Sequence, residues 1–317
     1  MSHPDLSFRR SSTPLAWLRS LMLCLALVTL CGFSAGRAIA EEGAVPHAEH
    51  HEGLSPDAPL IDLGIFKVTN SMIVTWIVAI FVIAFAQYAT RKVKDVPDGA
   101  QNFWEWIVES LHDFLESIIG RDLVKKTFWF FATVFIFILF SNWAGLIPGV
   151  GTIGWGTPNA QGGLDHISRP LFRGVNADLN MTLAMAVTFF ACWIIWALQA
   201  NGPGGFIMHI FGPKGKTQGF MKVLMVVVFA LVGVLEIVSI MFRPVSLSFR
   251  LYGNIFAGEN MLESMATINK AFAWLTPVPF YFMELLVGLV QALVFMLLTA
   301  VFTLLICQHE EGHDTHH

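Results

Sequence analysis

The residues of this chain best suited to chemistry gather in one apolar stretch, residues 236–263. The stretch lies between long apolar runs, and its polar and charged members include Glu236, Arg243, Arg250, Asn254, Glu259 and Glu263. Ionisable side chains at membrane depth are costly and typically mark ion pathways or proton relays. A carboxylate in a wet cavity can accept and release protons, whereas an arginine keeps its proton and can hold a partner carboxylate ionised. The stretch therefore predicts ion movement along acidic groups with a fixed positive charge between them.

Helical spacing places the acids on different sides of Arg250. At about 100° per residue, Ser246 and Asn254 lie one turn either side of Arg250, near its face. Glu236 returns to within roughly 40° of Arg250, about 21 Å towards the start of the helix. Glu259 lies about 13 Å towards the end of the helix and near the opposite face. These positions predict two acidic pathways that do not meet, so that an ion would cross only on a mobile carboxylate of another subunit.

The next apolar run supplies a matching polar face. Glu284, Gly288 and Gln291 share one side of a helix, because spacings of four and seven return close to the starting angle. In an antiparallel pair, Glu284 would reach the depth of Glu259, and Gln291 would lie nearer Arg250. The alternative is that Arg250 pairs with an acid of its own chain as a structural contact. The spread of acids over two helices and several faces favours the ion pathway.

Composition identifies an integral membrane protein. Of 317 residues, 55% are hydrophobic and 13% are charged, and the mean hydropathy is +0.62. Soluble domains carry about 25% charged residues. The chain has no nucleotide-binding loop of the Walker type and no Cys-x-x-Cys, and its four cysteines lie in apolar runs. We therefore expect no cofactor, no metal centre, no nucleic-acid partner and no catalysis by this chain alone.

The apolar runs predict an all-α, polytopic fold with five transmembrane helices and one amphipathic surface helix. The spans are expected at residues 72–89, 128–147, 179–198, 223–265 and 280–307. Residues 96–120 mix acids with apolar residues at helical spacing, which indicates the surface helix. At ~1.5 Å per residue, the fourth run is on the order of 60 Å long, about twice a ~30 Å hydrocarbon core. It is either broken at Arg243 and Pro244 or a single bent helix. Membrane helices tolerate proline, so we expect a single helix, with the last two helices long and tilted.

The ends and the charged loops predict the orientation. Residues 1–40 have an arginine-rich start, an apolar core and Ala-Ile-Ala at 38–40, which favours a cleaved secretory signal over an uncleaved membrane helix. Residues 41–70 and 308–317 are polar, His-containing tails, with the membrane domain over 71–307. Basic residues follow the first span and precede the second, and basic loops stay in the cytoplasm. The mature N-terminus is therefore expected outside the cytoplasm and the C-terminus inside.

Residues 243–259 carry a family resemblance and read R-P-V-S-L-S-F-R-L-Y-G-N-I-F-A-G-E. This segment resembles the signature of subunit a of F-type ATP synthase, the membrane stator that faces the rotating c-ring. The resemblance extends to Glu236 and to L-V-Q-A-L-V-F-M-L-L-T at 289–299, and it covers roughly residues 70–307. It implies that Arg250 is the essential arginine that meets each c-subunit carboxylate, flanked by Asn254 and Gln291. It also implies an outer half-channel lined by Glu259 and Glu284, and an inner one at Glu236.

The resemblance also implies partners and a location. They are the c-ring, b-type peripheral-stalk subunits and, indirectly, the F1 sector, in a bacterial inner membrane. Some family members hold histidine where this chain has Glu284, so the outer pathway of this chain has two acids and no histidine to relay protons. Both proton coupling and sodium coupling therefore stay open. Two other classes remain as alternatives: a self-contained cation/proton antiporter or channel, and a purely structural membrane subunit.

Overall fold

The structure is a computed structural model that describes residues 59–62, 67–147, 150, 153–158, 164–211, 220–268 and 275–307. The expected signal, most of the polar N-terminal segment and the His-rich tail lie outside the described residues. The elements follow in the order β1 (Pro59–Asp62), β2 (Lys67–Thr69), α2 (Asn70–Thr90), α3 (Ala100–Ile119), α4 (Arg121–Gly145), β3 (Gly154–Pro158), β4 (Leu164–Pro170), η2 (Val175–Ala177), α5 (Leu179–Phe211), α6 (Phe220–Ile268) and α7 (Val278–Cys307).

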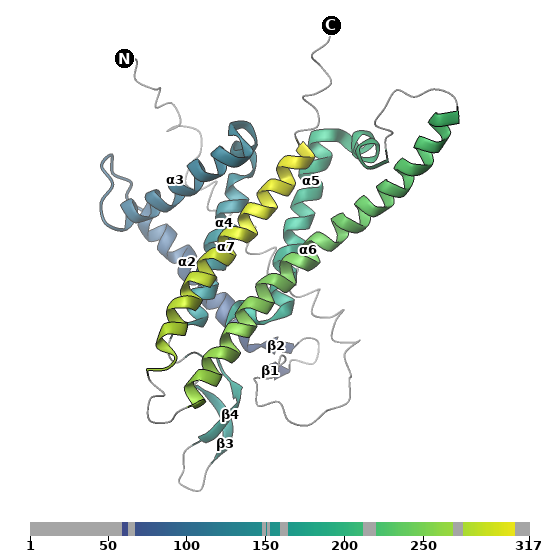
Figure 1. Ribbon diagram of the computed structural model, residues 1–317. Helices are drawn as coiled ribbons and strands as arrows, with labels where there is room; N and C mark the ends of the chain where they lie inside the picture. Colours follow the sequence, from purple (N-terminus) through teal and green to yellow (C-terminus); the bar gives the residue numbers. More distant parts are fainter. Residues whose placement is uncertain are drawn as a thin grey trace.

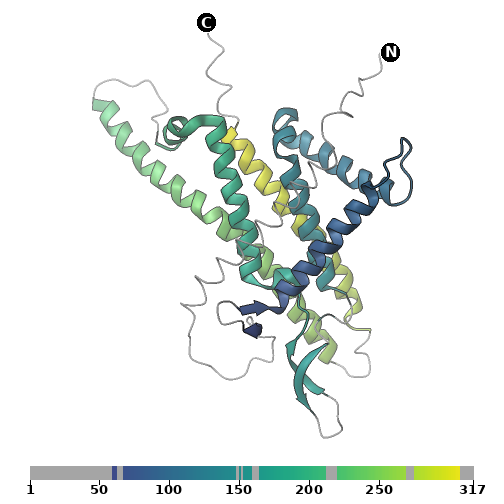
Figure 2. The ribbon, with the colours of Figure 1, turned by 180° about the vertical axis from the view of Figure 1, so that it is seen from behind.

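The predicted all-α membrane fold is confirmed. Within the described part, five helices are long and apolar enough to cross a membrane, namely α2, α4, α5, α6 and α7. Two short antiparallel hairpins, β1 with β2 and β3 with β4, join this helical fold. Both views of the ribbon place the four strands at one end of the molecule, opposite the end that holds α3 (Figures 1 and 2).

The surface helix is α3, which precedes the second span. Its buried residues include Trp104, Leu111, Leu115 and Ile119, which recur at helical spacing along one face. The large aromatic side chains of Phe103, Trp106 and Phe114 lie on the exposed side. One line of apolar residues therefore fixes α3 against the bundle and leaves the other aromatic residues outward, where membrane interfaces favour them.

The third span ends at a glycine. The span was expected at residues 179–198, but helical structure continues to Phe211 beyond a break at Gly202. Gly202 has φ of 67°, a conformation that glycine adopts without steric cost. Pro203 follows and suits the first position of a new helix because its fixed φ is already helical. The sequence pattern therefore predicted the membrane span of α5, but it did not predict the short helix after Gly202.

The fourth span, α6, is one continuous helix of 49 residues that contains Pro244. At ~1.5 Å per residue it is about 74 Å long, more than twice a ~30 Å hydrocarbon core. Figures 1 and 2 show its first half leaning away from the other helices, while its second half runs beside α7. The single long helix predicted for 223–265 is therefore confirmed, with slightly wider bounds.

The core lies where α4, α5 and α7 pack together. Phe130, Phe131, Phe189 and Trp193 are among its largest fully buried side chains, and Phe295 adds a fifth from α7. The rings of Phe130 and Trp196 meet edge to face at a centroid distance of 5.5 Å. This aromatic packing fixes α4, α5 and α7 relative to one another, and so fixes the frame on which α6 presents its polar residues.

Candidate functional site

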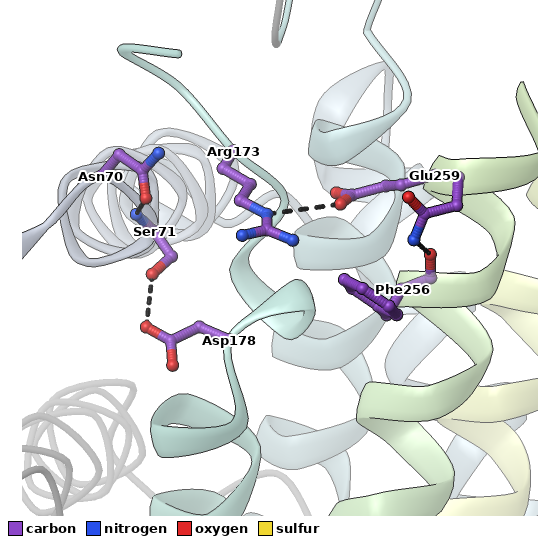
Figure 3. Close-up of polar contacts among 7 residues, drawn as sticks. Asn70, Ser71, Arg173, Asp178, Phe256 and Glu259 are labelled. Atoms are coloured by element: carbon purple, nitrogen blue, oxygen red, sulfur yellow. Dashed lines mark hydrogen bonds and ion pairs between the residues drawn. The ribbon is translucent and has the colours of Figure 1, made fainter. Parts of the chain in front are cut away.

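A buried ion pair joins α6 to the segment before η2. Arg173 Nε lies 3.5 Å from Glu259 Oε2, and the Arg173 side chain is only 4% exposed. The guanidinium also lies 5.8 Å from the centre of the Phe256 ring. Figure 3 shows Arg173 reaching across to Glu259, with Phe256 beside them on α6. One of the predicted acids therefore already has a cationic partner within the chain.

The second predicted outer acid, Glu284, packs directly against α6. It is buried, and a side-chain carbon at Gly258 would collide with its carboxylate. The glycine at position 258 therefore lets α6 and α7 pack closely. As a result, the Glu284 carboxylate lies against Gly258, the residue directly before Glu259 on α6. This is the depth that antiparallel packing predicted for Glu284. Its Oε1 atom accepts no hydrogen bond from the described residues.

An amide network continues from this point towards α4. Asn142 Nδ2 donates to the Gly288 carbonyl at 3.0 Å, one helical turn from Glu284. Asn176 Nδ2 donates to Asn142 Oδ1 at 2.6 Å. Both asparagines are buried. The end of α4, η2 and α7 thus meet through polar side chains at the depth of Glu284.

Asn254 and Gln291, which were both expected near Arg250, are hydrogen-bonded to each other. Asn254 Nδ2 donates to Gln291 Oε1 at 2.9 Å, which links α6 to α7. Gln291 is buried and Asn254 is exposed. The pair therefore lies at the boundary between the helix bundle and its outer surface, one turn from Arg250.

Arg250 lies on the exposed face of α6. Ser246 and Asn254, one turn on either side, are exposed as well, and so are Phe242 and Phe249 on the same helix. Among the described residues, Arg250 has neither an ion-pair partner nor a side-chain hydrogen bond. Arg250 thus stands within a long membrane helix, on a largely apolar surface that the described residues leave exposed.

Towards the start of α6, Glu236 pairs with Arg243. The distance between Glu236 Oε1 and Arg243 Nη2 is 3.4 Å. The Arg243 guanidinium also lies 4.7 Å from the centre of the Phe302 ring and 5.9 Å from that of Trp193. Arg243 therefore holds Glu236 in place and anchors α6 to α5 and α7 through cation–π contacts.

Sequence reasoning missed three residues of this site: Arg173, Asn142 and Asn176. They lie at the end of α4 and in the connection between β4 and α5, where helical periodicity gives no guidance. The only sequence signal was the charge of Arg173, which lies in the short connection before the apolar span of α5. Its role in the site could be recognised only from the structure, which places Arg173 against Glu259.

Five membrane spans and a buried charged cluster define a multi-pass membrane protein whose polar groups lie inside a helix bundle and on one of its faces. A family model described as ATP synthase A chain matches residues 72–303. The chain is 32% identical to ATP synthase subunit a of Gloeobacter violaceus over 78% of this chain and 86% of that protein. It is 31% identical to the Desulfotalea psychrophila subunit a (73% and 81% covered) and 30% identical to that of Moorella thermoacetica (80% and 96% covered). The chain therefore belongs to the ATP synthase A chain family.

Proposed function

We propose that this chain is the ion-translocating stator subunit of a rotary ATP synthase. The observation that carries the proposal is Arg250, which is exposed and unpaired among the described residues on an apolar membrane face. A charge in that position is costly unless a partner covers it. A ring of small subunits, each with one membrane carboxylate, would supply that partner and would carry the ion past Arg250.

Two offset half-channels would serve this ring. The inner one would start near Glu236, and the outer one would pass Glu259 and Glu284, at a different depth and on another face of α6. Arg250 lies between them and cannot release its proton. It would therefore stop ions from passing directly, while Ser246, Asn254 and Gln291 would adjust its contact with the ring. The chain contributes no nucleotide chemistry under this proposal.

The proposed partners are the c-ring, the b-type peripheral stalk and, indirectly, the F1 sector. The transported ion is a proton or a sodium ion, and the proposed location is a bacterial inner membrane. Arg91 and Lys92 follow α2, and Lys125 and Lys126 lie in the first turns of α4, at the same end as the C-terminal end of α7 (Figure 1). Basic segments stay cytoplasmic, which supports a cytoplasmic C-terminus and a mature N-terminus outside.

Reconstitution separates this function from that of a self-contained antiporter or channel. The whole complex in liposomes is expected to make ATP when an ion gradient is imposed. The purified chain alone is expected to conduct neither protons nor sodium, since the ion must ride on a ring carboxylate. Ion exchange by the chain alone would contradict the proposal. A purely structural role would instead appear in Arg250→Ala as a reduced amount of complex with unchanged coupling in what remains.

A further inference from the structure

We propose that Arg243 is a positioning residue for the inner half-channel, an inference that rests on the proposed function. Arg243 fastens α6 to α5 and α7 at the point where α6 leaves the helix bundle. It thereby fixes the direction of the first half of α6, and with it the place of Glu236 relative to the ring.

The packing of α6 changes at Arg243. Among the described residues 228–242, only Gly233 and Ile240 are buried. Directly after Arg243, buried residues recur at helical spacing, namely Pro244, Leu247, Ser248, Leu251 and Ile255. Figures 1 and 2 show the same change, because the first half of α6 leans away from the helices that its second half accompanies. Arg243 therefore stands where the less supported part of α6 begins.

The helix is also weakened at this point. Pro244 has no backbone N–H, so the carbonyl of Ile240 loses its partner in the helical ladder. Sharp kinks in helices occur mainly at proline. A helix of 49 residues with a proline near its middle is therefore expected to bend there unless a contact with another element holds it.

Two aromatic rings supply that contact. The central carbon of the Arg243 guanidinium lies 4.7 Å from the centre of the Phe302 ring on α7 and 5.9 Å from that of Trp193 on α5. Trp193 and Phe302 are themselves joined, because Trp193 Nε1 donates to the Phe302 carbonyl at 3.1 Å. Trp193 is only 2% exposed, and cation–π contacts strengthen as water is excluded. The guanidinium thus binds where α5 and α7 already contact each other.

Trp193 also contacts the short helix at the end of α5. The ring of Phe206 meets that of Trp193 edge to face at a centroid distance of 6.4 Å. Asn201 Nδ2 donates to the Ile306 carbonyl at 2.9 Å, at the end of α7. The ends of α5 and α7 are therefore fixed to each other around Trp193, so Arg243 is attached to a rigid frame.

Glu236 pairs with the same guanidinium. The Arg243 side chain is 22% exposed, and that of Glu236, at a distance of 3.4 Å, is 43% exposed. A partly exposed ion pair contributes little to stability, so the rings rather than the acid anchor Arg243. The pair instead fixes the Glu236 carboxylate, which lies seven residues earlier on α6.

The first test measures the direction of α6 in the full chain, reconstituted in lipid nanodiscs with its four cysteines replaced by alanine. Spin labels are attached at Leu231→Cys on α6 and Leu198→Cys on α5, two exposed positions. Leu231 lies about 18 Å along the helix from Arg243, so a swing of about 20° would move it by about 6 Å. The parent is expected to give a narrow distance distribution, and Arg243→Gln and Phe302→Leu are each expected to broaden it by about that amount.

Three further variants separate the rings from the charge. Glu236→Gln removes the ion pair but keeps both ring contacts, so its label distance should match the parent. Arg243→Lys keeps a charge but not the planar guanidinium, and its distribution should lie between those of the parent and Arg243→Gln. Phe282→Leu is the matched control on α7, because Phe282 is 70% exposed and lies outside the ring contact. Its distribution should stay narrow.

The second test measures ATP synthesis by the whole complex in liposomes, driven by an imposed ion gradient and normalised to the amount of assembled complex. Arg243→Gln and Phe302→Leu are each expected to lower this rate by about tenfold, because Glu236 is displaced from the ring. The double variant should be no slower than the slower single variant, since both changes break the same contact.

A parental label distance in both Arg243→Gln and Phe302→Leu would overturn the inference. A parental rate per complex in both, with only the amount of complex reduced, would overturn it as well. If Arg243→Gln yields too little folded chain, Phe302→Leu decides alone. The distance is measured on the chain without the ring, so it is independent of the proposed function. Coupled synthesis in Arg250→Ala would contradict the stator function and leave the distance result standing.

Discussion

At the scale of single residues, the arginines of the site differ in whether they have an acidic partner. Arg173 and Arg243 each have an acid within 3.5 Å, and each also lies near an aromatic ring. Arg250 has no such partner among the described residues and is exposed. Paired arginines hold the described fold together, whereas Arg250, unpaired among the described residues, is the residue that we propose meets the c-ring.

The Asn254–Gln291 hydrogen bond gives a prediction at this scale. Gln291 is buried, so removing its partner leaves an amide unpaired at a cost of about 1–3 kcal/mol. Asn254→Leu and Gln291→Leu should each lower the stability of the solubilised chain, and the double variant should cost less than the sum. Thermal unfolding of the three variants measures the coupling. Strict additivity would mean that the bond contributes nothing.

Much of the site was predictable from residue spacing. The shared depth of Glu284 and Glu259, and the position of Gln291 near the Arg250 region of α6, followed from helical angles in an antiparallel pair. The pairing of Glu236 with Arg243 did not, since only the side-chain conformations decide it. Arg173 was missed because its partner is 86 residues away and its own segment has no period.

At the scale of elements, close packing of α6 and α7 depends on Gly258. A side-chain carbon there would overlap the Glu284 carboxylate. Gly258→Ala should therefore destabilise the chain by about 1–3 kcal/mol, the usual cost of overpacking. Gly253→Ala is the matched control on the same helix, because nothing lies within 4 Å of its added carbon.

Thermal unfolding of both glycine variants tests this contact. The Gly253→Ala variant should be neutral or slightly stabilised, because alanine favours helix over glycine by about 1 kcal/mol. Adding Glu284→Asp to Gly258→Ala shortens the carboxylate and should recover part of the lost stability. Equal stability of the two glycine variants would contradict the proposed role of Gly258.

Long helices with a clear run of apolar residues could be predicted from the sequence, whereas short elements could not. Long apolar runs gave all five spans, and the tolerance of membrane helices for proline gave the continuity of α6 through Pro244. The β1–β2 hairpin was not predicted, because its strands have four and three residues, too short for an alternating pattern. The helix after Gly202 was hidden by the glycine and proline that start it.

At the scale of the whole molecule, the polar groups are distributed unevenly along α6 and α7. Glu236 belongs to the first half of α6, which leans away from the other helices, whereas Glu259 belongs to the second half, which runs beside α7 (Figure 1). Glu284 lies on α7 and packs against α6 at Gly258. Arg250 stands between them on the outer face of α6. Because the two acidic regions lie at different depths, a mobile carboxylate passing Arg250 would connect them one at a time.

The most direct measurement is ATP synthesis by the assembled complex carrying Arg250→Ala, driven by an imposed ion gradient. The proposed role predicts a normal amount of complex and synthesis at background, since no fixed positive charge then separates the two half-channels. Arg250→Lys, which keeps a charge but not the planar guanidinium, should also lose most synthesis. Coupled synthesis at the parental rate in Arg250→Ala would contradict the stator function.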